Sequence, residues 1–196
     1  MTLFMNTPTM LTFFRLACIP LFVLVFYASI AHHHLLAACV FALAAFTDYL
    51  DGYLARQWSQ VTRFGSFLDP VVDKLMIIAG LLLLVDSYHE PWLTIAAYII
   101  IIREVAVSAL REWMAQVGSR QKVNVKVIAR IKTLIQMFAI TGLILLQGYV
   151  SPGLKIFFAV MLYIAVALTI WSMIIYLKAA WFDLSADKPI EDNMRE

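Results

Sequence analysis

The stretch DYLDGYLARQWSQVTRFGSFLDPVVD, residues 48–73, carries four aspartates and joins two long apolar runs of the sequence. Asp48 and Asp51 lie toward the end of the preceding run, and Asp69 and Asp73 lie around the start of the following one. Ionised carboxylates are costly in apolar surroundings, so acidic residues at such positions usually serve a function. This stretch therefore locates a candidate site, and the apolar runs around it determine the fold.

The chain as a whole has the composition of a membrane protein. Of its 196 residues, 63% are hydrophobic and 14% are charged, whereas an average soluble domain is about 45–50% apolar. Six apolar runs are candidates for membrane-spanning helices, at residues 16–31, 35–54, 71–85, 92–109, 131–147 and 154–177. We expect an all-α integral membrane protein with one domain over 1–196, in which 1–15 forms a short interfacial helix and 183–196 a polar tail.

The positions of Lys and Arg predict how these spans are oriented. The segments after the first, third and fifth runs contain no Lys or Arg, and only Lys155 lies close to one of them. The segments after the second and fourth runs carry several basic residues, and the C-terminal segment begins at Lys178. The positive-inside rule then places both termini and the aspartates on the cytoplasmic side of the cell inner membrane. A net charge of +2 is too small to indicate a nucleic-acid partner.

The spacing of the four aspartates predicts that their side chains meet. On a helix that turns by about 100° per residue, Asp48 and Asp51 lie close together around one face. Asp69 and Asp73 are four residues apart and share a face of the next helix. Because the connecting segment is short, we expect the two helices to be antiparallel neighbours with all four carboxylates at one membrane depth.

Carboxylates packed this closely repel one another unless they are protonated, paired or neutralised by cations. Their oxygen-only chemistry, with no His or Cys nearby, suits hard divalent ions such as Mg²⁺ or Mn²⁺, and four carboxylates can hold two ions. Gly52, Ala55 and Gly65 leave room for a phosphate group, and Arg56 offers a bidentate phosphate contact. Asp69, which precedes a proline, is alternatively a helix N-cap. That alternative accounts for one aspartate and not for four.

The pattern Asp-x-x-Asp-Gly-x-x-Ala-Arg, eight residues, then Gly-x-x-x-Asp-x-x-x-Asp resembles the signature of the CDP-alcohol phosphotransferases, and each fixed position is present with the family's spacing. The resemblance implies a bundle of six membrane helices that usually forms homodimers. It also implies that the four aspartates hold two divalent ions, which bind the pyrophosphate of CDP-diacylglycerol, while Gly52, Ala55, Arg56 and Gly65 line the cytidine diphosphate pocket. Asp73 corresponds to the general base, which takes a proton from the acceptor alcohol so that its oxygen attacks the lipid-side phosphorus and expels CMP.

The identity of the acceptor alcohol depends on other residues. In and between the fourth and fifth runs the sequence is rich in cations, and five of these are candidates for binding an acceptor phosphate: Arg103, Arg111, Lys126, Arg130 and Lys132. Alternatively, any one of them only sets the topology or contacts anionic lipid headgroups. Arg15, ahead of the first run, can either reach the headgroups or turn inward.

Residues 6–15, 103–113 and 130–136 resemble the branch of the family that makes phosphatidylglycerophosphate. Arg130 departs from that branch, where Lys is common, but it keeps the charge. The resemblance implies sn-glycerol 3-phosphate as the acceptor. Within the family, the alternatives are transfer to phosphatidylglycerol, giving cardiolipin, or to inositol phosphate. An alternative of another class is a cation transporter, which would spread acidic residues across the membrane depth.

Overall fold

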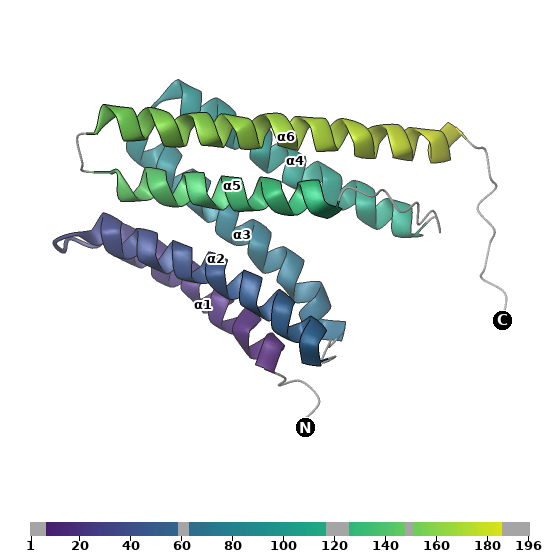
Figure 1. Ribbon diagram of the computed structural model, residues 1–196, viewed down its shortest axis with the longest axis horizontal. Helices are drawn as coiled ribbons and strands as arrows, with labels where there is room; N and C mark the ends of the chain where they lie inside the picture. The colour runs from purple at the N-terminus through teal and green to yellow at the C-terminus, as the bar shows by residue number, and fades with distance from the viewer. Residues whose placement is uncertain (1–6, 59–62, 117–125, 148–150, 186–196) are drawn as a thin grey trace.

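The computed structural model describes residues 7–58, 63–116, 126–147 and 151–185, with side chains for 10–48, 65, 67–114, 131–147, 151–178 and 181. The described part contains six helices (Figure 1): α1 (Thr7–Phe26), α2 (His33–Trp58), α3 (Arg63–Tyr88), α4 (Pro91–Gln116), α5 (Lys126–Leu145) and α6 (Pro152–Ser185). No strand occurs among these residues. The prediction of an all-α fold with six main helices is confirmed.

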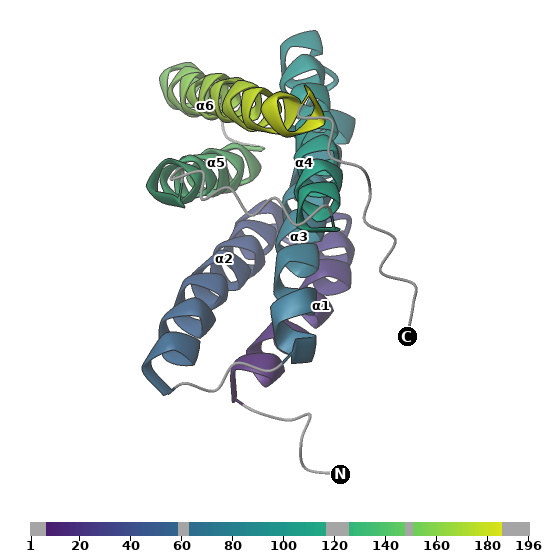
Figure 2. The ribbon, with the colours of Figure 1, turned by 90° about the vertical axis from the view of Figure 1, so that its right-hand side faces the viewer.

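The helices form two groups. In the first, α1 packs against both α2 and α3, whereas α2 and α3 touch each other only slightly. In the second, α6 packs against both α4 and α5, and α4 and α5 have no helix-to-helix contact in the described part of the chain. The groups join where α5 meets α2 and α3, and where α4 meets α3; Figure 2 shows α5 and α6 above α1 and α2. It is therefore α1, and not direct packing of α2 on α3, that positions the aspartate-bearing helices.

The core depends on close approaches between aromatic rings and glycines. The rings of Phe22 and Phe41, both fully buried, are 5.4 Å apart between centroids. A Cβ atom on Gly80 would lie 2.7 Å from the Phe41 ring, and one on Gly142 would lie 2.3 Å from the Phe158 ring. Small residues allow such approaches between helices that pack without the help of water. The two glycines thus fix how α2 meets α3 and how α5 meets α6.

All six helices begin before the apolar runs that predicted them, and α1 and α3 do so by the widest margins. Residues 7–15, which we expected in a separate interfacial helix, continue without a break into α1. Similarly, α3 begins at Arg63, so Asp69 and Pro70 lie inside the helix. The N-cap alternative for Asp69 is therefore wrong. Hydropathy detects the apolar part of a helix, whereas the backbone hydrogen bonds continue into polar sequence.

Two helices are long and apolar enough to cross a membrane, α4 over Pro91–Met114 and α6 over Pro152–Lys178, in the part of the chain that was searched. Shorter apolar stretches lie in α1, α2 and α5, at Met10–Phe26, His33–Asp48 and Ile131–Leu145. Every helix also exposes large apolar side chains, among them Leu24, Phe46, Leu82, Ile102, Phe138 and Trp171. Apolar surface this widespread favours a lipid environment over water.

Candidate active site

The first helix carries two buried polar side chains, Thr12 and Arg15, one turn apart on the same face. They are 0% and 1% exposed. The sequence left both directions open for Arg15, and the structure shows that it turns inward. A guanidinium group this deeply buried needs acceptors around it, so the neighbours of Arg15 define the candidate site.

Those neighbours are aspartates from two other helices. Arg15 Nη1 lies 3.0 Å from Asp48 Oδ1 on α2 and donates a hydrogen bond to Asp73 Oδ1 on α3. One turn earlier on both α1 and α3, Thr12 Oγ1 donates to Asp69 Oδ1. Thr12 precedes Arg15 on α1 as Asp69 precedes Asp73 on α3, because the two helices run parallel. Through these contacts, α1 links three of the four predicted aspartates.

The aspartates that contact Arg15 are themselves partly exposed. The side chains of Asp48 and Asp73 are 36% and 33% exposed, whereas that of Arg15 is 1% exposed. The arrangement is thus an anionic surface with a buried cation beneath it. Both carboxylates are therefore partly accessible from outside the protein.

The donor set fits a hard divalent cation, because carboxylate oxygens of Asp48 and Asp73 meet at a single nitrogen of Arg15. Among the described side chains, no three His, Cys, Asp or Glu residues are grouped so that they could hold a metal ion. Asp51 lies on α2, three residues after Asp48, and its side chain is outside the described part. The four-aspartate metal site stays a prediction.

The residues predicted to line the cytidine diphosphate pocket occupy neighbouring helix ends. Gly52, Ala55 and Arg56 lie in the last two turns of α2, and Gly65 lies in the first turn of α3. Gly65 is buried, and the side chains of Ala55 and Arg56 are outside the described part. All four positions lie at the same end of the bundle as the aspartates, on the right in Figure 1.

A second polar cluster lies among α4, α5 and α6. Glu104 Oε1 accepts hydrogen bonds from Arg103 Nη1 at 2.6 Å and from Lys132 Nζ at 2.8 Å. Arg103 Nη2 donates to Ser172 Oγ on α6 at 2.7 Å. Arg103, Lys132 and Ser172 are all buried. Because α4 and α5 lack helix-to-helix contact in the described part, the Glu104 carboxylate joins these helices through side chains.

The structure brings together two of the five cations predicted to bind the acceptor phosphate, Arg103 and Lys132. Glu104 leaves this pair with one net positive charge instead of two. Arg111, two turns beyond Arg103, is exposed, with its guanidinium carbon 5.9 Å from the centroid of the Tyr176 ring. The other two cations, Lys126 and Arg130, lie in the first two turns of α5 with side chains outside the described part.

The aspartate cluster lies in the second half of α2 and the first half of α3, whereas the Glu104 cluster lies near the middle of α4 and α6. The ends of α2 and α4 and the beginnings of α3 and α5 all point to the right in Figure 1. The three described aspartates of the site, Asp48, Asp69 and Asp73, lie in the halves of α2 and α3 nearest this end.

Sequence reasoning assigned no role to Thr12, Glu104 or Ser172. The signal for Thr12 was its spacing from Arg15, because polar residues three apart share a helix face that must find partners. Glu104 follows directly after a buried cation, and its second partner, Lys132, comes from another helix. Ser172 is a single hydroxyl in an apolar run, and such residues are too common for the sequence to single it out.

Comparison with known proteins gives a consistent result. A family model described as CDP-alcohol phosphatidyltransferase matches residues 5–171, which include both clusters except Ser172. A Yersinia pestis protein named CDP-diacylglycerol–glycerol-3-phosphate 3-phosphatidyltransferase is 46% identical over 180 residues, covering 92% of this chain and 97% of that protein. Proteins of the same name from Pectobacterium atrosepticum and Haemophilus influenzae are 49% and 50% identical, covering 91% and 89% of this chain and 97% and 93% of their own lengths.

Proposed function

The chain belongs to the CDP-alcohol phosphatidyltransferase family, and we propose that it transfers the phosphatidyl group of CDP-diacylglycerol to sn-glycerol 3-phosphate. The products are phosphatidylglycerophosphate and CMP. The names of relatives that are 46% to 50% identical support this donor and this acceptor. The structural observation that carries the proposal is the meeting of Asp48 and Asp73, from α2 and α3, at Arg15 of α1.

We assign Asp48, Asp51, Asp69 and Asp73 to two divalent ions, Mg²⁺ or Mn²⁺. When bound, such ions neutralise the pyrophosphate and offset the charge on the attacking and leaving oxygens. The convergence of Asp48 and Asp73 and their partial exposure support this assignment. In the absence of the ions, Arg15 is the cation that holds these two carboxylates together.

Asp73 serves as the general base in this proposal. Its carboxylate takes the proton from the attacking hydroxyl of glycerol 3-phosphate, and the hydroxyl oxygen forms a bond to the lipid-side phosphorus. The bond between that phosphorus and the bridging oxygen breaks, and its electron pair leaves with CMP. Two features support this role: Asp73 is one-third exposed, so an acceptor can reach it, and the hydrogen bond from Arg15 fixes its orientation.

Gly52, Ala55, Arg56 and Gly65 bind the cytidine diphosphate part of the donor in this proposal. Their positions at the facing ends of α2 and α3 support the assignment, because the lipid-linked phosphates must reach the aspartates on the same two helices. Arg56 offers a planar pair of donors for one phosphate. Glycine and alanine leave the backbone open to approach.

The acceptor phosphate is bound by a set of cations in α4 and α5, namely Arg103, Arg111, Lys126, Arg130 and Lys132. The buried cluster around Glu104 supports this for two of them, because Arg103 and Lys132 are held in fixed positions and keep a net positive charge. Glu104 is then a positioning residue. It holds a guanidinium and an ammonium group from different helices at one point.

We further propose that all six helices cross the cell inner membrane, with both termini and the active site on the cytoplasmic side, and that the enzyme is a homodimer. Large apolar side chains exposed on every helix support the membrane location. The basic residues gathered in alternate connecting segments support the orientation.

An acceptor panel tests the proposed reaction. Purified protein receives Mg²⁺ and CDP-diacylglycerol together with glycerol 3-phosphate, phosphatidylglycerol, inositol phosphate or no acceptor, and CMP release is measured. We expect CMP release only when glycerol 3-phosphate is the acceptor. Equal or greater release with phosphatidylglycerol would instead indicate the cardiolipin-forming reaction. Cation flux into proteoliposomes with no CMP release from any acceptor would support the transporter.

A further inference from the structure

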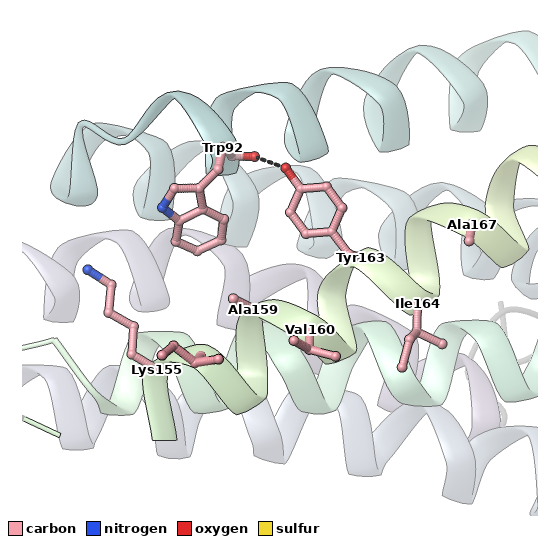
Figure 3. Close-up of a pocket in the computed structure, with 8 residues that line it drawn as sticks. Trp92, Lys155, Ala159, Val160, Tyr163, Ile164 and Ala167 are labelled. Carbon is pink, nitrogen blue, oxygen red and sulfur yellow. Dashed lines mark hydrogen bonds between the residues drawn. The ribbon is translucent and has the colours of Figure 1, made fainter. Parts of the chain in front are cut away.

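An apolar groove lies between the first turn of α4 and the first half of α6 (Figure 3). Both helices begin at the end of the molecule opposite to the aspartates (Figure 1). Its lining includes Trp92, Lys155, Ala159, Val160, Tyr163 and Ile164. Its volume is about 610 Å³, which falls within the range of roughly 300–1,000 Å³ typical of ligand sites. No step of the proposed reaction uses this groove.

The two walls of the groove are joined by a hydrogen bond. Tyr163 Oη on α6 donates to the backbone oxygen of Trp92 on α4 at 2.9 Å. Figure 3 shows the indole nitrogen of Trp92 and the ammonium group of Lys155 at one end of the groove, with Ala159, Val160 and Ile164 along the rest. The groove therefore has hydrogen-bond donors at one end and an apolar remainder.

Among the described residues, Lys155 is the one Lys or Arg at this end of the molecule, where the acidic residues Asp86 and Glu90 also lie. The segments after α1, α3 and α5 contain no Lys or Arg, so no neighbouring cation shares its role. Its ammonium group lies 4.6 Å from the centroid of the Tyr88 ring. Among the described residues, no carboxylate lies within ion-pair distance of Lys155, and Asp86 at the same end accepts a hydrogen bond from Tyr27. Because Lys155 is only partly buried and makes no ion pair with a described carboxylate, its ammonium group is available to an anion from outside the chain.

We infer that this groove binds a phospholipid with an anionic headgroup. One acyl chain lies along Ala159, Val160 and Ile164, and the headgroup phosphate accepts hydrogen bonds from Lys155 Nζ and Trp92 Nε1. The inference rests on the proposed membrane location and not on the transfer reaction.

The helices that form the groove support a lipid over a second copy of the chain. Among the described residues, α4 and α6 contain the two longest apolar spans, and only 33% of the apolar stretch of α4 and 28% of that of α6 are buried inside the molecule. In the proposed membrane location, much of their remaining surface is therefore available to lipid. A purely apolar partner helix would leave the Lys155 charge without an anion, whereas a phosphate headgroup supplies one.

Native mass spectrometry of the full-length protein tests this inference. The protein is purified in detergent with equal amounts of phosphatidylglycerol and phosphatidylcholine that carry the same acyl chains, and the retained lipids are counted. We expect preferential retention of phosphatidylglycerol, reduced roughly fivefold by Lys155→Ala. Ala159→Trp, which fills the groove, should reduce the retention of both lipids. Lys178→Ala, at the other end of α6, is the matched control and should behave as wild type.

CMP release by each variant, measured in parallel, separates this inference from the proposed reaction. Lys155→Ala should keep wild-type CMP release, since it lies far from the aspartates. Equal retention of the two lipids by wild type, or unchanged retention by Lys155→Ala, would overturn the inference. A shift from dimer to monomer in Ala159→Trp, with lipid retention unchanged, would overturn it in favour of a second copy. If wild type released no CMP but still retained phosphatidylglycerol preferentially, the proposed reaction would be refuted and the lipid site would not.

Discussion

Among the individual residues, Arg15 has the most unusual environment, since its charge is almost fully enclosed and is balanced by Asp48 and Asp73. The sequence could not decide its direction, because a long side chain near a helix end can reach either way. The deciding contacts come from α2 and α3, which are distant in sequence. Glu104 is a similar case, since Lys132 lies 28 positions away on another helix.

Arg15→Ala should destabilise the protein in the absence of divalent ions. Removing one partner of a buried ion pair costs about 3–5 kcal/mol, and because the aspartates are partly exposed we expect the low end, a fall of roughly 5–10 °C in the unfolding midpoint. Added Mg²⁺ should raise the midpoint of the variant more than that of wild type, because the ions replace the missing cation. Arg15→Lys, which keeps the charge, should lose less. An Arg15→Ala midpoint equal to wild type in EDTA would contradict the role of Arg15.

At the scale of the helices, the sequence predicted roughly where each helix lies along the chain, but it did not predict which helices pack against one another. Long apolar runs indicate helices directly, so six were found. The insertion of α1 between α2 and α3 depends on Thr12 and Arg15 finding partners far along the chain. The early start of α3 was missed because polar residues, Arg63, Ser66 and Asp69, interrupt the apolar pattern there, and because Pro70 suggested a helix boundary.

Gly142→Leu should loosen the packing of α5 on α6. Even the first side-chain atom at this position would lie 2.3 Å from the Phe158 ring, so that ring or the helix must move. Overpacking of this kind costs about 1–3 kcal/mol, measurable as a lower thermal unfolding midpoint. Gly153→Leu is the matched control, since a Cβ atom there meets nothing within 4 Å. Adding Phe158→Ala to Gly142→Leu should recover part of the loss, and equal effects of the two glycine variants would refute the packing role.

Glu104→Gln should weaken the connection between α4 and α5. Arg103 and Lys132 would then be buried together without a compensating negative charge. We expect a lower unfolding midpoint and a higher KM for glycerol 3-phosphate, with kcat less affected, because the two cations lose their fixed positions. Glu112→Gln, an exposed glutamate two turns further along α4, should change neither quantity. A normal KM in Glu104→Gln would show that the cluster does not position the acceptor.

For the whole molecule, the orientation in the membrane can be tested with single cysteines. In a chain whose Cys18 and Cys39 have been replaced, Ser151→Cys precedes α6 and Lys178→Cys lies near its other end. A membrane-impermeant maleimide added to intact spheroplasts should label Ser151→Cys, whereas Lys178→Cys should be labelled only after permeabilisation. The reverse pattern would place the aspartates on the outer side, away from cytoplasmic glycerol 3-phosphate.

The most direct test of the central claim is the transfer of labelled glycerol 3-phosphate into lipid by purified protein with CDP-diacylglycerol and Mg²⁺. Wild type should form one labelled phosphate-bearing lipid for each CMP released. Asp73→Asn should slow this by about 10² to 10⁴-fold because the proton acceptor is lost. Asp86→Asn, at the other end of α3, should remain close to wild type. CMP release without labelled lipid, or undiminished transfer by Asp73→Asn, would contradict the account.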